Sequence, residues 1–193
     1  MLGWNEDIKK ELGACGVDVH IGHNVMISDP SQVFIGDHVR IDPFTLITTR
    51  LETGNYIHIT AYSMLGGGTR HLIKLGNWTF IGYGSKLFCA SEDYSGIHGP
   101  VNEYWGHNSI HHGDITLNDY SGIASDVILM PGVELPEGCT IGAKSFVYTR
   151  NTLTPWSIWI GNPLKLHGPR DEKTVRALSQ DPNFQKSHED IHQ

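Results

Sequence analysis

Residues 91 to 114 concentrate the side chains that could carry acid–base chemistry. The stretch contains Glu92, Asp93 and His98, and four of the twelve histidines of the chain lie within it. Carboxylates and imidazoles are the groups that most often take or give protons in enzymes. The same stretch interrupts a regular repeat, and interruptions of a rigid scaffold are where functional residues gather. The composition therefore predicts a catalytic loop.

Two residues of this loop are candidates for a general base. Glu92 closes the six-residue unit that begins at Leu87, at the point where the loop departs. His98 is the rival, because imidazole titrates near neutral pH. Asp93 and Tyr94 follow directly and are candidates for substrate contacts, although Asp93 equally suits the turn that Asp-Tyr-Ser-Gly predicts. We expect the other loop histidines to be solvated, and His71 to be a surface residue.

Aliphatic residues recur every six positions through most of the chain. The longest uninterrupted run is Leu117, Ile123, Leu129, Leu135, Ile141, Val147 and Leu153. Neither the 3.6-residue period of a helix nor the alternation of a long strand gives this spacing. A short strand and a turn in each hexad, with three hexads closing one coil of 18 residues, does give it. We therefore predict an all-β fold, a left-handed parallel β-helix of hexapeptide repeats. Gly often follows the aliphatic residue, as at 36, 54 and 142, and we expect it there to adopt turn dihedrals that a Cβ would oppose.

The register of the repeat survives two insertions. Successive coils begin at residues 35, 53, 75, 117, 135 and 153, so one coil carries four extra residues and the next carries 24. An ordinary β-sandwich with scattered glycines would not keep this register. The larger insertion is the candidate loop at 91–114.

The two ends of the repeat have different patterns. We divide the chain into a capping segment at 1–14, the β-helix with its inserted loop at 15–165, and an extension at 166–193. Residues 5–12 predict a short capping helix with Asn5 as its N-cap and Gly13 as its stop. Residues 171–180 predict a second short helix.

Bulk properties exclude several classes of protein. The formal net charge is −7 and no basic stripe is present, which argues against nucleic-acid binding. No segment approaches the roughly 20 apolar residues of a membrane span. The three cysteines are few and odd in number, and they indicate reduced thiols in a cytoplasmic protein.

The sequence resembles the hexapeptide-repeat acyltransferases. The segments that carry the resemblance are IGDHVRIDPF (35–44), GNYIHITAY (54–62), SEDYSG (91–96), ILMPGVELPEGCTIGAKSFV (128–147) and PWSIWIGNP (155–163). They are most similar to a branch of bacterial surface-polysaccharide enzymes that includes N-acyltransferases of nucleotide-linked 4-amino-4,6-dideoxyhexoses. The resemblance implies a homotrimer, with acetyl-CoA or another short acyl-CoA in the groove between the β-helices of neighbouring subunits. It also implies a small-molecule sugar acceptor, such as a dTDP-linked sugar.

The resemblance also implies roles for individual residues. Glu92 stands where sugar O-acetyltransferases carry a catalytic His and the amino-sugar branch often carries Asp, so it is the implied base for an amine acceptor. The implied CoA contacts are Ala124, Ser125, Gly142 and Ala143 for the pantetheine arm, and Thr149, Arg150 and Lys165 for the phosphates.

Three alternatives remain at this point. In the first alternative, the acceptor is a hydroxyl of a galactoside or a surface polysaccharide, and His98 then becomes the stronger candidate base. The same prism serves γ-type carbonic anhydrases, and His107 and His112 have an HxxxxH spacing, but zinc needs a third ligand that the sequence does not place. A non-catalytic scaffold is the third alternative, and the polar insertion speaks against it.

Overall fold

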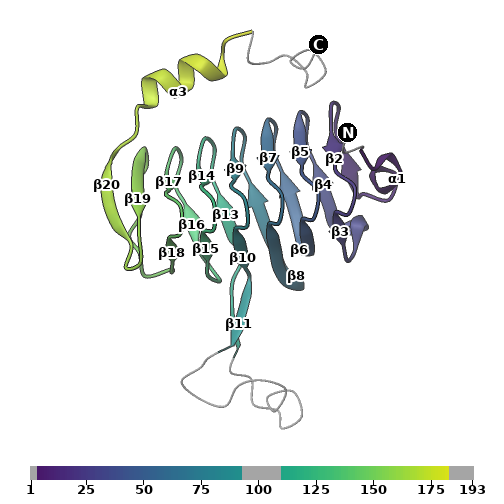
Figure 1. The fold of residues 1–193 in the computed structure, drawn as a ribbon, viewed down its shortest axis with the longest axis horizontal. Helices are drawn as coiled ribbons and strands as arrows, with labels where there is room; N and C mark the ends of the chain where they lie inside the picture. The colour runs from purple at the N-terminus through teal and green to yellow at the C-terminus, as the bar shows by residue number, and fades with distance from the viewer. Residues whose placement is uncertain (1–3, 93–109, 183–193) are drawn as a thin grey trace.

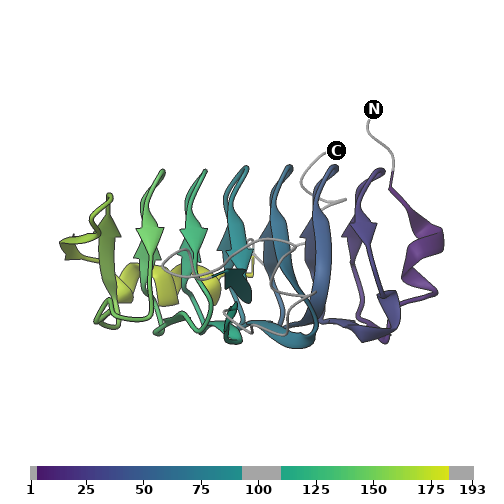
Figure 2. The ribbon, with the colours of Figure 1, turned by 90° about the horizontal axis from the view of Figure 1, so that it is seen from below.

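A computed structural model describes residues 4–92 and 110–182 of the chain. It is a left-handed parallel β-helix of about six turns, in the form of a long prism (Figure 1). Seen from below, the coils stack in regular order from the N-terminal to the C-terminal end (Figure 2). The predicted fold class is confirmed.

The prism has three sides, which we number in the order in which each coil runs through them. The short strands of the first side are β1 (Ala14–Cys15), β4 (Val33–Ile35), β13 (Ile115–Leu117) and β16 (Glu134–Leu135). The second side is a separate eight-stranded sheet: β2 (His20–Ile21), β5 (Val39–Ile41), β7 (Ile57–Ile59), β9 (Phe80–Ile81), β14 (Gly122–Ile123), β17 (Thr140–Ile141), β19 (Ser157–Ile160) and β20 (Lys165–Pro169). The third side has β3 (Met26–Ile27), β10 (Lys86–Phe88), β15 (Ile128–Leu129) and β18 (Phe146–Val147).

Two longer strands turn a corner of the prism. β6 (Leu46–Thr53) and β8 (Met64–Leu75) begin on the third side and end on the first. β6 pairs with β3 through Ile27 and Ile47, and then with β4 through Val33 and Leu51. This continuity joins the first and third sides into one ten-stranded sheet.

The repeated aliphatic residues form the axis of the prism. Nearly all have at most 3% of their surface exposed, from Ile21 near the N-terminal end of the prism to Val147 near its C-terminal end. Burying each such side chain stabilises the fold by about 1.5–3 kcal/mol. The small residue four positions later lies buried at a corner, where its hydroxyl has a local partner: Thr45 donates to the carbonyl of Asp42 at 2.9 Å, and Ser145 to that of Gly142 at 2.6 Å. These two hydroxyls are therefore satisfied within their own coil.

The glycines after the aliphatic residue have a different purpose from the predicted one. Gly36 and Gly142 are not in the left-handed region. They lie against the next coil, and a Cβ on Gly142 would stand 2.5 Å from Cγ2 of Ile160.

The residue of each hexad with left-handed backbone dihedrals lies three positions after the aliphatic residue, and it is usually not glycine. At the corner between the first and second sides, which we call the first corner, most of these residues have an aromatic ring, and neighbouring rings stack, as Tyr56 and Trp78 do with centres 4.2 Å apart.

Both predicted helices are present, but the first is shorter than predicted: it ends at Lys9 with Lys10 as its C-cap, so Gly13 is not its stop. α1 (Glu6–Lys9) starts at Asn5, whose side chain accepts a hydrogen bond from the Ile8 amide. α3 (Glu172–Ser179) starts at Asp171, whose carboxylate caps the Thr174 amide. None of the helices within residues 4–92 and 110–182 has the length and apolar character that crossing a membrane requires.

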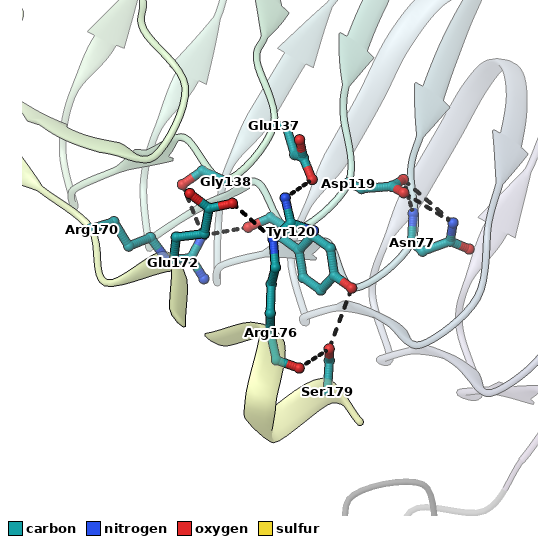
Figure 3. Close-up of polar contacts among 9 residues, drawn as sticks. All are labelled: Asn77, Asp119, Tyr120, Glu137, Gly138, Arg170, Glu172, Arg176 and Ser179. Carbon is teal, nitrogen blue, oxygen red and sulfur yellow. Dashed lines mark hydrogen bonds and ion pairs between the residues drawn. The ribbon is translucent and has the colours of Figure 1, made fainter. Parts of the chain in front are cut away.

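The C-terminal segment folds back along the first corner (Figure 3). The Arg170 guanidinium donates to the carbonyl oxygens of Tyr120 and Gly138. One turn into α3, Arg176 pairs with Glu137 at 2.7 Å and lies over the Trp156 ring. These contacts fix α3 to the side of the prism opposite strand β11 (Ala90–Glu92) (Figure 1).

Candidate active site

The inserted loop leaves the prism as an antiparallel hairpin. Its stem is formed by β11 (Ala90–Glu92) and β12 (Ile110–His112), and it departs from the corner between the third and first sides, which we call the third corner. Glu92 pairs with Ile110, and Ala90 pairs with His112. Side chains two apart along a strand share a face, so Glu92 and His112 are diagonal neighbours on one face of the hairpin.

Four predicted loop residues lie outside the described part of the chain. They are Asp93, Tyr94, His98 and His107. Of the candidate bases, the structure therefore places Glu92, which is half-buried at the end of β11. Its predicted role stays a prediction.

A cavity of about 420 Å³ lies beside the stem of the hairpin. Its lining includes Thr149 and Arg150, the predicted phosphate contacts, together with His111, His112 and Tyr148. The Arg150 guanidinium lies 3.9 Å from the centre of the Tyr148 ring, a cation–π contact that orients it. The cavity thus combines a fixed cation with hydroxyl and imidazole groups, which is a suitable environment for an anionic group.

The predicted pantetheine contacts lie at a different corner, between the second and third sides. Ala124 and Ser125 occupy this second corner on one coil, and Gly142 and Ala143 occupy it on the next. The Lys144 amide donates to the carbonyl of Ser125 at 3.0 Å, which places the two pairs one above the other. They form a strip of small residues that a narrow chain can approach closely.

Lys165 lies beyond the last coil, at the same end as this strip. It is exposed on β20 and pairs across the sheet with Ile160, whose side chain covers Gly142. The predicted CoA contacts therefore fall into two groups within one chain. Thr149 and Arg150 are at the third corner with Glu92, and the other five are at or near the second corner.

A buried thiol lies directly before the hairpin. Cys89 precedes β11 and is fully buried, and burial raises the pKa of its thiol to about 12, with the nearby Asp114 charge acting in the same direction. Cys89 is therefore neutral at physiological pH and packs as a small apolar residue. Within residues 4–92 and 110–182, no three His, Cys, Asp or Glu side chains are grouped closely enough to hold a metal ion.

Sequence reasoning missed a pair of histidines at the base of the hairpin. His71 and His112 hydrogen-bond to each other at 3.0 Å, and His71 retains only 16% of its side-chain surface. His71 was expected at the surface, but it lies in the four-residue insertion, directly under the hairpin. The one available signal was that both departures from the 18-residue period fall in neighbouring coils.

Comparisons with known proteins agree with this architecture. No family model matches the chain. A curated dTDP-4-amino-4,6-dideoxy-D-glucose acyltransferase from Escherichia coli is 29% identical over 191 residues, covering 92% of each chain.

Two solved structures of AntD, an N-acyltransferase from Bacillus cereus, are also similar. A cysteine-for-serine mutant in complex with dTDP-4-amino-4,6-dideoxyglucose and Coenzyme A is 30% identical, with a TM-score of 0.84 over 93% of this chain and 96% of that one. AntD in complex with dTDP and 3-hydroxybutyryl-CoA matches equally well, at 30% identity and a TM-score of 0.84 over the same shares.

Proposed function

The chain belongs to the hexapeptide-repeat N-acyltransferases of nucleotide-linked amino-deoxysugars, and on this premise we propose that it acylates the amine of a dTDP-4-amino-4,6-dideoxyhexose, using an acyl-CoA as donor. The observation that carries the proposal is the likeness to AntD, which extends over 93% of the chain. AntD has been crystallised with both an amino-sugar nucleotide and Coenzyme A.

The reaction is direct acyl transfer. The sugar amine attacks the thioester carbonyl, a C–N bond forms, and the C–S bond then breaks to release CoA. The attacking nitrogen must lose a proton as it becomes an amide, and the thiolate of CoA takes one up. A base that accepts the first proton and can return it to the sulfur satisfies both requirements without a covalent enzyme intermediate.

Glu92 is the residue we propose as this base. It lies in the stem of the inserted hairpin, whose other strand contributes His111 and His112 to the lining of the cavity that also contains Arg150. A carboxylate suits an amine acceptor, which enters as an ammonium ion that a negative charge attracts and needs only a weak base once it has lost its first proton. A hydroxyl acceptor would require a stronger base.

We propose that the active form is a homotrimer. One chain holds Glu92 and Arg150 at the third corner and the strip of small residues at the second, with the third side between them. In a three-fold assembly, the second corner of one chain can face the third corner of its neighbour, so that both groups of predicted contacts line one groove. Cyclic symmetry repeats the contact three times and leaves no open end. Static light scattering checks this: a mass of three chains agrees with the proposal, and a monomer at working concentration contradicts it.

We place the protein in the cytoplasm. Cys15, Cys89 and Cys139 are all unpaired thiols. Structural disulfides are typical of oxidising compartments and rare in the cytosol, so three free thiols agree with a reducing compartment.

A thiol-release assay tests the reaction. Acetyl-CoA and 3-hydroxybutyryl-CoA are each supplied with dTDP-4-amino-4,6-dideoxyglucose or with a simple galactoside. We expect turnover with the amino sugar, and we expect Glu92→Gln to lose about 10²–10⁴-fold in kcat. Glu11→Gln, a change at an exposed site on the N-terminal segment, is the matched control and should retain full activity. Turnover with the galactoside alone contradicts the amine assignment, and near-full activity of Glu92→Gln removes Glu92 as the base.

A further inference from the structure

The two insertions in the repeat meet in space. In β8 the step from Leu65 to Ile73 takes eight residues, whereas the corresponding step in β6, from Ile47 to Leu51, takes four. The extra residues of β8 form a bulge at the third corner. In the next coil, the hairpin of β11 and β12 leaves the prism at this same corner. The amide of Cys89 donates to the carbonyl of Gly66, so the two departures are adjacent.

Two imidazoles join these insertions. Nε2 of His71, from β8, lies 3.0 Å from Nδ1 of His112, from the hairpin, and the rings stack at 4.9 Å with 20° between their planes. Nδ1 of His71 lies 3.4 Å from a carboxylate oxygen of Asp114. The same oxygen accepts a hydrogen bond from the Leu72 amide at 3.0 Å. Both nitrogens of the His71 ring therefore face groups of the hairpin or of the segment that follows it.

Strand β6 of the preceding coil restrains the backbone of His71. The Thr49 hydroxyl lies 2.7 Å from the carbonyl oxygen of His71 and 3.1 Å from that of Gly68. Thr49 is itself only 3% exposed. The backbone that carries His71 is thus tied to the rigid prism, and the imidazole passes this restraint to the hairpin.

The restrained face of the hairpin is the one that carries Glu92. His112 pairs with Ala90, and Glu92, two residues further along β11, is the diagonal neighbour of His112. We infer that His71, acting through His112, is a positioning residue that fixes Glu92 for proton transfer. This inference rests on the proposed function, because Glu92 matters only if it acts on the acceptor.

The contact has a chemical signature that separates positioning from catalysis. His112 uses Nδ1 toward His71, and the amide of an asparagine occupies nearly the same place relative to the backbone as Nδ1 of histidine. His112→Asn therefore retains a partner for His71, whereas His112→Ala removes it. If His112 instead exchanged protons with substrate, asparagine would not replace it, because an amide does not titrate in this range.

The experiment measures kcat and KM for His71→Ala, His112→Ala, the double variant and His112→Asn. We expect each alanine variant to lose about ten- to a hundredfold in kcat. KM for acyl-CoA should stay within about twofold of wild type for His71→Ala, because His71 does not line the cavity, whereas His112→Ala removes a cavity imidazole and should raise KM. The double variant should lose no more kcat than the more impaired of the two single variants, because both changes remove the same contact. His112→Asn should recover most of kcat. His23→Ala, at an exposed position of the first coil, is the control and should behave as wild type.

A second readout does not depend on the reaction. Amide hydrogen exchange in β11 and β12 should become faster in both alanine variants and return toward wild type in His112→Asn. Unchanged exchange, or losses in kcat that multiply in the double variant, would overturn the inference. So would an inactive His112→Asn with normal exchange, since His112 would then act on substrate itself. If the wild type turns over no amino sugar, the proposed function fails, and hydrogen exchange still decides whether the histidines fix the hairpin.

Discussion

A Cβ added to Gly36 would stand 2.4 Å from the carbonyl oxygen of Gly54, one coil further along the prism. The same crowding occurs at Gly82, where a Cβ would meet the backbone of Ala124 at 2.4 Å. Glycine at these positions lets successive coils approach to the spacing that their hydrogen bonds need. The requirement comes from close packing between coils and not from turn dihedrals.

Gly36→Ala should therefore destabilise the protein. The obstacle is backbone, which cannot rotate aside, so we expect a loss of about 1–3 kcal/mol in the free energy of unfolding. Denaturant titration measures it. Gly168→Ala is the matched control, because a Cβ there meets nothing within 4 Å and its backbone is not left-handed, and it should be neutral. Equal stability of the two variants would show that the coils can separate without penalty.

Asp42 connects two neighbouring strands of the second side. Its carboxylate is 3% exposed, and it accepts hydrogen bonds from Arg40 at 2.6 Å and from His58 at 2.9 Å. Burial alone would raise the pKa of Asp42, but the hydrogen bonds from His58 and Arg40 outweigh burial and lower it below its ordinary value of 3.8. The ionised form is thus the one that the fold prefers.

Asp42→Asn should cost stability in a pH-dependent way. Because the folded-state pKa is lowered, the stabilisation is fully present above the unfolded-state pKa of about 3.9 and is lost as the pH falls through the folded-state value. We expect the variant to be about 1–3 kcal/mol less stable at pH 7, and the difference to shrink below about pH 4. Unfolding titrations from pH 3 to 7 measure this, with Glu11→Gln as the control for loss of one exposed negative charge. A difference that grows in acid would contradict the assignment.

Much of the fold could be predicted from the sequence, because its determinants are local and periodic. Aliphatic residues such as Ile35 and Ile41, or Ile123 and Leu129, lie six positions apart because each points to a common axis, so the pattern itself indicates three sides and one core. The two insertions were visible as breaks in this register. The N-cap at Asn5 could likewise be predicted, since capping depends on residues three positions apart.

The site was less predictable because its contacts join residues far apart in the chain. His71 and His112 are separated by 41 positions, and no periodicity relates them. The sequence did not indicate that the predicted CoA contacts would lie on two surfaces of one chain: Gly142 and Arg150 are eight residues apart yet lie at different corners of the prism. A hexad spacing fixes which side a residue is on, but it does not say which sides cooperate in binding.

The three cysteines should differ sharply in reactivity. Cys15 is exposed, whereas Cys89 and Cys139 are fully buried, and burial raises their thiol pKa values to about 12 and about 11. Only a thiolate attacks a disulfide reagent efficiently. We therefore expect one thiol per chain to react with an aromatic disulfide at pH 8 in the native protein, and three in denaturant. Cys15→Ser should abolish the native reaction. Two or more reactive native thiols would mean that the coils around Cys89 or Cys139 open readily.

Arg150 should contribute to binding of the CoA phosphates and not to the chemical step. It lines the cavity beside the hairpin, and its guanidinium is held over the Tyr148 ring. Loss of one charge-assisted hydrogen bond to a phosphate weakens binding by about 1.5–3 kcal/mol, so Arg150→Ala should raise KM for acyl-CoA by about tenfold or more with kcat little changed. Lys173→Ala removes one positive charge from exposed α3 and is the control, with KM unaltered.

Replacing the donor by its 3′-dephospho form identifies the phosphate that Arg150 binds. If Arg150 binds the 3′-phosphate, the wild type and Arg150→Ala should have similar KM values for this donor. If the tenfold difference persists, Arg150 binds the pyrophosphate instead, and an unchanged KM for both donors would remove Arg150 from the CoA site.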